Sequence, residues 1–126
     1  MVGIVVIAHS RKLAEGVAEV ARAMGVGKAV VEPAGGDDHG GLGTSMERLE
    51  RAVRTADGGD GVVVLADLGS SVLTAKVFAA AAGTGVVLVD APLVEGAVAA
   101  ASMAAAGADL RAVVRAAEAA RGHRKT

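Results

Sequence analysis

Four short apolar runs recur along the chain, and each is followed by a stretch that has helical periodicity. The first run, residues 2–10 (VGIVVIAHS), is apolar at consecutive positions rather than at alternate ones. A strand that is apolar on both faces has to be buried on both faces, which is typical of the centre of a parallel sheet. Further runs occupy residues 28–32 (KAVVE), 62–66 (VVVLA) and 86–89 (VVLV). The pattern therefore predicts four buried strands.

The stretches that follow these runs predict about five helices. The first is expected to begin after an N-cap at Ser10, the second after a cap at Thr44 or Ser45, and the fifth after a cap at Asp109. The expected ranges are 11–24, 46–56, 71–82, 93–106 and 109–121. The apolar stripe of the first helix is predicted at three- to four-residue spacing: Leu13, Val17, Val20 with Ala21, and Met24. The stripe of the second is predicted as Met46, Leu49, Val53 and Ala56.

Strands that alternate with helices indicate parallel βαβ units joined by right-handed crossovers. The predicted fold is an α/β domain with three layers, in which a doubly wound sheet of four parallel strands in the order 2-1-3-4 is flanked by helices. This order places a switch point between the first and third strands, and ligands bind at such points near the carboxyl ends of the strands. His9 follows the first strand and Asp67 follows the third, so we expect them in one crevice.

His9 is the residue on which the chemistry depends. One ring nitrogen could attack phosphorus if a carboxylate accepted the N–H of the other nitrogen, fixed the tautomer and stabilised the developing positive charge. Asp67 is the candidate for that carboxylate. The alternatives are that His9 is an ordinary loop or capping residue and that Asp67 caps the third helix.

Five hydroxyl side chains fall at predicted strand ends or helix starts on this edge of the sheet. Their hydroxyls and the neighbouring N–H groups could bind phosphoryl oxygens, although each of them could equally be a helix cap. These candidate phosphoryl-binding residues are Ser10, Thr44, Ser45, Ser70 and Ser71.

Residues 33–43 contain five glycines and no apolar run, so they are expected to form a loop that is functional or mobile. Asp37, Asp38 and His39 in this loop would allow a metal site, but isolated residues of this kind are usually solvated, and no metal site is expected. Glu95 could cap a helix or contact a partner.

Composition narrows the function classes. The net charge of −1, from 13 basic and 14 acidic residues, does not indicate binding to nucleic acid or to a membrane. Phe78 is the single aromatic residue, so base stacking is not expected. The chain of 126 residues has no cysteine, no signal-peptide pattern and no apolar stretch that could span a bilayer. A single cytoplasmic domain is the expected class.

Four ordered segments carry a resemblance to a known family: IVVIAHSRKLAEGVAEVA, AGGDD with GLGTS, LADLGSS, and DAPLVEGA. They resemble the DhaM subunits of phosphotransferase-system-dependent dihydroxyacetone kinases, whose relatives are the enzyme IIA domains of the mannose family. The resemblance implies one such domain over residues 1–121, followed by a frayed tail at 122–126. It implies that His9 accepts a phosphoryl group from the phosphocarrier protein HPr and that Asp67 orients His9.

The same resemblance implies the partners. The phosphoryl group would pass to ADP held on the DhaL subunit, and the ATP formed there would phosphorylate dihydroxyacetone on DhaK. This chain would then bind no cofactor of its own, and it would form a homodimer. Two other functions stay open: an enzyme IIA component of a mannose-, fructose- or sorbose-type sugar transporter, which differs in its acceptor, and a non-catalytic flavodoxin-like regulatory module.

Overall fold

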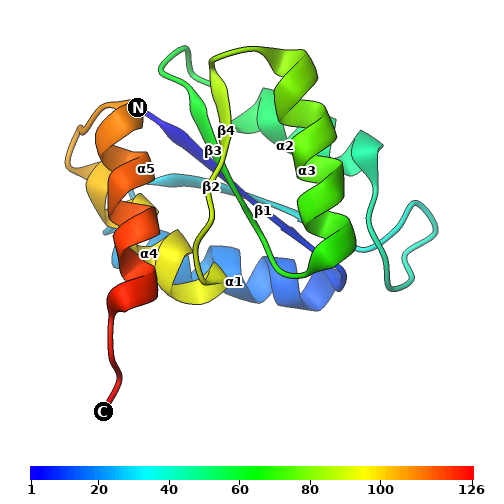
Figure 1. Cartoon of the computed structure of the whole chain (residues 1–126), viewed down its shortest axis with the longest axis horizontal. Coiled ribbons are helices and arrows are strands. Elements are labelled where there is room, and N and C mark those ends of the chain that lie inside the picture. The colour runs from blue at the N-terminus through cyan, green and yellow to red at the C-terminus, as the bar shows by residue number, and fades with distance from the viewer.

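The computed structural model describes residues 1–126 and shows a four-stranded sheet between two layers of helices (Figure 1). The strands are β1 (Gly3–Ala8), β2 (Val30–Gly35), β3 (Val62–Ala66) and β4 (Val86–Leu88). They are all parallel and lie in the order β2-β1-β3-β4. The helices are α1 (Arg11–Met24), α2 (Met46–Ala56), α3 (Gly69–Ala82), α4 (Leu93–Ala105) and α5 (Leu110–Ala119). The predicted three-layer, doubly wound α/β fold is confirmed.

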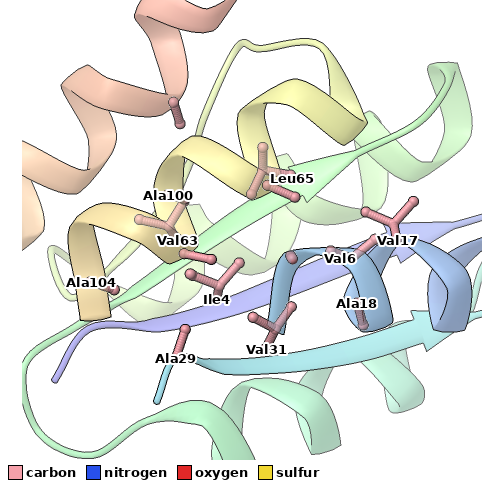
Figure 2. Packing of buried hydrophobic residues seen from close by; sticks show 14 of the residues in the cluster. Ile4, Val6, Val17, Ala18, Ala29, Val31, Val63, Leu65, Ala100 and Ala104 are labelled. Carbon is pink, nitrogen blue, oxygen red and sulfur yellow. The ribbon is translucent and has the colours of Figure 1, made fainter. Parts of the chain in front are cut away.

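The sheet separates two hydrophobic cores. α1, α4 and α5 cover one face, where they pack on Ile4 and Val6 (Figure 2). α2 and α3 cover the other face, where they pack on Val5 and Ile7. Because side chains alternate across a strand, β1 has to be apolar at consecutive positions, and all six of its residues are buried. The continuous apolar run therefore identified the central strand correctly.

The apolar stripe that was predicted for α1 is wrong at most of its large positions. The buried residues of this helix are Ala14, Val17, Ala18 and Ala21. Leu13, Val20 and Met24 are instead 43%, 46% and 56% exposed. α1 packs closely against the sheet and α4, so its contact face is built mainly from alanine, and the larger apolar side chains lie on its flank.

The two edges of the sheet differ. The second strand was predicted at residues 28–32 but runs from Val30 to Gly35, through Pro33. Proline is tolerated there because β2 is an edge strand, on which a residue does not need to donate to a neighbour. The guanidinium of Arg22 also donates to the carbonyl of Val31. At the opposite edge, β4 is three residues long and half-buried throughout.

The helix caps follow the sequence closely. Ser10 Oγ accepts from the N–H of Leu13 at 3.2 Å, and Asp109 Oδ1 accepts from the N–H of Ala112 at 2.9 Å. α5 passes into a short 3-10 helix at Ala120–Gly122. Residues 123–126 follow without regular structure. None of the helices has both the length and the apolar character that crossing a bilayer requires.

Candidate functional site

His9 lies in the tight turn between β1 and α1, directly after the last residue of the central strand. A buried strand fixes the backbone on one side of it, and the helix capped by Ser10 fixes the backbone on the other. The imidazole itself is 30% exposed. The chain therefore holds a rigidly mounted ring that molecules in solution can still reach.

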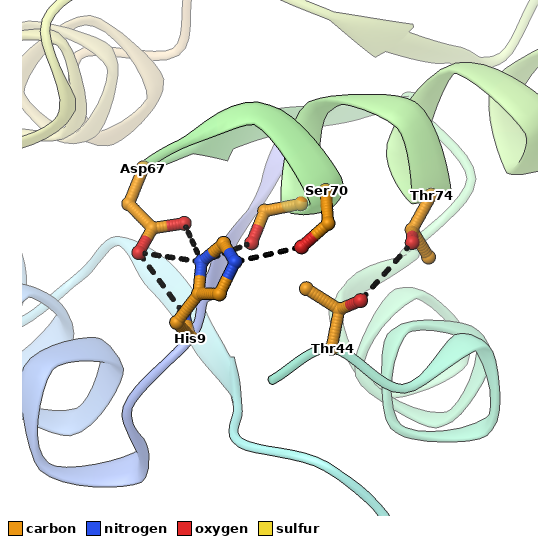
Figure 3. A network of polar contacts seen from close by, with 6 residues as sticks. His9, Thr44, Asp67, Ser70 and Thr74 are labelled. Atoms are coloured by element: carbon orange, nitrogen blue, oxygen red, sulfur yellow. Dashed lines mark hydrogen bonds and ion pairs between the residues drawn. The ribbon is translucent and has the colours of Figure 1, made fainter. Parts of the chain in front are cut away.

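Asp67 contacts this ring, as the predicted topology requires (Figure 3). Its two carboxylate oxygens lie 3.1 and 3.2 Å from His9 Nδ1, and the backbone N–H of His9 donates to Oδ2 at 3.0 Å. The Asp67 N–H in turn donates to the carbonyl of Ile7 at 3.2 Å. The Asp67 side chain is 8% exposed, so solvent screens the contact with His9 only weakly.

Burial of the Asp67 carboxyl acts to raise its pKa. Hydrogen bonds from the backbone N–H of His9 and from the side chains of Ser71 and His9 outweigh that effect, so the pKa of Asp67 lies below its ordinary value. Asp67 is therefore ionised at neutral pH. An ionised carboxylate accepts hydrogen bonds and donates none, so Nδ1 is the ring nitrogen that carries the hydrogen.

The other ring nitrogen, Nε2, is then the one with the free lone pair in the neutral ring. The hydroxyl of Ser70 lies 2.6 Å from Nε2 and donates to it. The hydroxyl oxygen of Ser71, a fully buried residue, lies 3.2 Å from Nδ1. Ser70 and Ser71 thus meet opposite nitrogens of one imidazole.

Both serines come from the first turn of α3, which begins at Gly69 and not at Ser71 as predicted. The N-cap residue is Leu68, so Asp67 is not the N-cap of this helix, and the N-cap side chain makes no hydrogen bond to the N–H groups of the first turn. Unsatisfied N–H groups at a helix N-terminus attract anions. This helix start lies next to Nε2 through Ser70 (Figure 3), so the site combines a nucleophilic nitrogen with donors for a negatively charged group.

Thr44 approaches the site from the glycine-rich loop. The N–H of the preceding residue, Gly43, donates to the carbonyl of His9 at 2.9 Å. The hydroxyl of Thr44 accepts from that of Thr74 at 3.4 Å. Both threonines lie on the Nε2 side of the ring, beyond Ser70 (Figure 3). Thr74 was not among the candidate residues predicted from the sequence. Its position four residues after Ser70 in a predicted helix, which puts both side chains on one face, could have indicated it.

Two of the predicted hydroxyl groups are engaged elsewhere. The Ser10 hydroxyl caps α1. The Ser45 hydroxyl accepts from the N–H of Arg48 at 3.1 Å, donates to Asp38, and is buried. Ser45, rather than Thr44, is thus the cap of α2. Of the five predicted hydroxyl residues, the structure brings Thr44, Ser70 and Ser71 toward the ring.

The acidic residues of the loop serve its own hydrogen bonding. Asp37 Oδ1 accepts from the N–H groups of His39 and Gly41 at 2.9 and 2.8 Å. No three His, Asp or Glu side chains are grouped so that they could hold a metal ion. Glu95 lies in the first turn of α4 and pairs with Lys125 at 2.7 Å, and this position agrees with the helix-start role considered for it.

The fold and the site define a class: a small doubly wound α/β domain in which an aspartate orients an accessible histidine at the switch point of the sheet. Residues 3–114 match the EIIA-man family, which is described as the PTS system fructose IIA component. This match covers most of the chain. The protein therefore belongs to that family of phosphotransferase-system domains.

DhaM subunits of dihydroxyacetone kinases are similar to this protein over most of its chain. It is 37% identical over 121 residues to DhaM, the phosphoryl donor subunit of the PEP-dependent dihydroxyacetone kinase of Escherichia coli K12. That match covers 90% of the chain but 26% of the relative, so the chain spans about a quarter of the length of that subunit. It is 30% identical over 112 residues to the DhaM subunit of Lactococcus lactis, covering 88% of the chain and 89% of the relative.

A solved structure has the same fold. The crystal structure of EF1359, described as a protein of unknown function, superimposes with a TM-score of 0.84. The two chains are 29% identical, and the match covers 99% of this chain and 98% of the other. The arrangement of strands and helices is thus shared over practically the whole length.

Proposed function

We propose that this protein is a phosphohistidine carrier of the DhaM type, in which His9 accepts a phosphoryl group and passes it on. The observation that carries the proposal is the orientation of the His9 ring. Asp67 holds Nδ1 and leaves the lone pair of Nε2 pointing at the Ser70 hydroxyl and the uncapped start of α3. The names of the relatives supply the phosphoryl-donor role in a dihydroxyacetone kinase.

The proposed transfer step needs no group beyond those present on the two proteins. The Nε2 lone pair of neutral His9 forms a bond to phosphorus while the P–N bond of a donor phosphohistidine, which carries a proton on its other ring nitrogen, breaks. The electron pair of that bond returns to the donor ring, which leaves as a neutral imidazole. His9 becomes a phosphoimidazolium that keeps its Nδ1–H, and the Asp67 carboxylate stabilises the new positive charge. Positioning and charge stabilisation provide most of the rate in such transfers.

Ser70 has to change partners during this step. In the free protein its hydroxyl donates to Nε2 at 2.6 Å and so occupies the side of the ring from which phosphorus must approach. Once the N–P bond exists, Nε2 no longer accepts, and the same hydroxyl donates to a phosphoryl oxygen. The free N–H groups of the first turn of α3 bind the remaining negative charge.

The proposed donor is phospho-HPr, and the proposed acceptor is ADP bound to DhaL, from which DhaK would phosphorylate dihydroxyacetone in the cytoplasm. The nucleotide belongs to DhaL in this scheme. The second candidate is an enzyme IIA component of a sugar transporter, which is favoured by the description of the matching family as a fructose IIA component. The chemistry at His9 would be the same, and only the acceptor would differ.

Intact-protein mass spectrometry tests the proposal. The protein is incubated with phosphoenolpyruvate, enzyme I and HPr, and purified DhaL with ADP is then added. We expect one phosphoryl group on the wild type, none on His9→Ala, and loss of the group when DhaL–ADP is present. His39→Ala and His123→Ala are matched controls, since both histidines are exposed and make no contact with Asp67. Labelling of His9→Ala would refute the carrier role, and label that persists with DhaL–ADP but moves to a sugar IIB domain would establish the transporter role.

A homodimer is also part of the proposal. Two features support it: β4 ends the sheet without a covering strand and is half-buried, and Leu73 and Val77 of the neighbouring α3 are 64% and 62% exposed. Sedimentation of the wild type should give twice the mass of the chain. Leu73→Glu combined with Val77→Glu should weaken the association, and a wild type that sediments as a monomer at all concentrations would contradict the proposal.

A further inference from the structure

We propose that Thr44 and Thr74 are phosphoryl-binding residues that form a hydroxyl wall beyond Ser70, Thr44 from the loop and Thr74 from the next turn of α3, and that Asp37 is the positioning residue that holds Thr44 in place. This inference rests on the proposed function, because it concerns the phosphoryl group on His9. It gives Thr74 and Asp37 a role, and it identifies the hydroxyls that would bind phosphoryl oxygens together with Ser70.

The hydroxyls of Thr44 and Thr74 lie beyond Ser70, on the Nε2 side of the His9 ring (Figure 3). A phosphoryl group on Nε2 projects away from Asp67 and toward Ser70, beyond which Thr44 and Thr74 lie with their hydroxyls turned toward each other (Figure 3). Thr74 follows Ser70 by four residues in α3, so their side chains lie on one face of the helix, one turn apart. A tetrahedral group at this place has donors from α3 on one side and from the loop on the other.

The two threonines make only a weak hydrogen bond with each other. Their hydroxyl oxygens are 3.4 Å apart, well beyond the usual distance for two hydroxyl groups. Both residues are half-buried. A charged phosphoryl oxygen is a stronger acceptor than a neutral hydroxyl, so the pair can exchange its long mutual bond for two shorter ones.

Hydrogen bonds around Asp37 hold the loop that precedes Thr44. The N–H of Asp37 donates to the carbonyl of Gly41 at 3.0 Å, and Asp37 Oδ1 accepts from two N–H groups of the same turn. Arg48 Nε, from α2, donates to the Asp37 carbonyl at 3.0 Å. These bonds close residues 37–41 into one tight turn and tie it to α2.

The closed turn packs against Gly43, the residue before Thr44. Gly43 has a φ of 148°, and a Cβ at this position would lie 3.3 Å from the Cβ of Asp37. The Asp37 side chain is therefore packed against Gly43, whose N–H binds the carbonyl of His9. The structure thus gives a continuous path from Asp37 through Gly43 to both Thr44 and His9. The same backbone bonds lower the pKa of Asp37, so it stays ionised in its turn.

Chemical phosphorylation with phosphoramidate tests this inference without any partner protein. The rate of labelling of His9 and the lifetime of the phosphohistidine are measured by intact mass. Thr44→Val and Thr74→Val should each slow labelling by about tenfold, the effect of one charge-assisted hydrogen bond, whereas Thr44→Ser and Thr74→Ser should stay within about twofold of the wild type. Thr55→Val is the matched control, because the hydroxyl of this exposed residue bonds the carbonyl of Arg51 in α2.

A double-mutant cycle tests the positioning role. If Asp37 acts through Thr44, Asp37→Ala should slow labelling in the wild-type background but have no further effect in the Thr44→Val background. Asp37→Asn retains an acceptor oxygen and should recover part of the rate. A general loss of structure would slow both backgrounds equally and would overturn the positioning role. If the loop variants do not fold, Thr74→Val on α3 still tests the hydroxyl wall.

The outcomes separate this inference from the carrier role. Wild-type labelling of both threonine variants, with His9 as the labelled residue, would overturn the inference and leave the carrier role intact. Labelling of the wild type by phosphoramidate but not by phospho-HPr would refute the HPr-dependent relay, and a dependence of that labelling on the Thr44 and Thr74 hydroxyls would still support the inference.

Discussion

Replacement of Asp67 by Asn is the most informative single change to the site. The carboxylate accepts two groups of His9, the backbone N–H at 3.0 Å and Nδ1 at 3.1 Å. Asparagine has one acceptor oxygen and an NH2 group that can only donate. Asp67→Asn therefore leaves a single oxygen to accept from both donors and places an NH2 group beside the ring, and it removes the negative charge that would face the proposed phosphoimidazolium.

The magnitude follows from these losses. A hydrogen bond to a charged group contributes about 1.5–3 kcal/mol net, and the Asp67 side chain is 8% exposed, so water compensates for little of it. The His9 ring is 30% exposed, which weakens the charge term. We take about 2 kcal/mol for the change in stabilisation of the phosphoimidazolium, which corresponds to roughly 30-fold slower phosphorylation.

The assay is single-turnover labelling by phospho-HPr, followed by intact mass. Long-range proton–nitrogen NMR of His9 adds a second readout, since Asp67→Asn should lower the population of the tautomer with hydrogen on Nδ1. Asp90→Asn is the matched control, because the Asp90 side chain is 93% exposed and pairs with Arg121 at 3.4 Å. Wild-type labelling together with an unchanged tautomer in Asp67→Asn would refute the assigned role of Asp67.

The other predictions concern stability. Folding lowers the pKa of Asp67, so ionised Asp67 contributes its full stabilisation at neutral pH and loses it as the pH falls below about 4. The free energy of unfolding should therefore decrease in acid, and Asp67→Asn should make this decrease less steep in acid titrations. Gly3→Ala should destabilise by about 3 kcal/mol, since its Cβ would lie 2.2 Å from the carbonyl oxygen of Ala56. Gly16→Ala, with no atom within 4 Å of its new Cβ, should stabilise by about 1 kcal/mol, and thermal melts that rank the two variants in the opposite order would contradict the packing argument. Val26 has a φ of 49° and is 74% exposed, so Val26→Asn should raise the free energy of unfolding by about 1 kcal/mol in urea titrations, while a decrease would show that the valine is not strained.

The sequence was sufficient for the order of the sheet and for the range of α1. The apolar run of β1 identified its central strand, and Ser10 marked the start of the following helix. It was not sufficient for the buried face of α1. Leu13, Val20 and Met24 follow a helical spacing as well as the alanines do, and the distance between helix and sheet, which selects small side chains, depends on tertiary packing.

The candidate site was foreseen in part for a similar reason. The contact between His9 and Asp67 follows from strand order alone, because parallel strands end at one edge. Thr74 was missed because its pairing with Thr44 depends on where the glycine-rich loop folds back. Asp37 was read as solvated, since its partners are backbone N–H groups within its own turn, which residue types do not reveal.

The unequal borders of the sheet limit how copies of this molecule could join. Pro33 withholds a donor along β2, and Arg22 already occupies the Val31 carbonyl, so an incoming backbone finds few free groups there. Joining by way of β4 uses the one open border of each molecule and leaves none for a third. Strand-to-strand growth would therefore close after two copies and would not continue into a fibre.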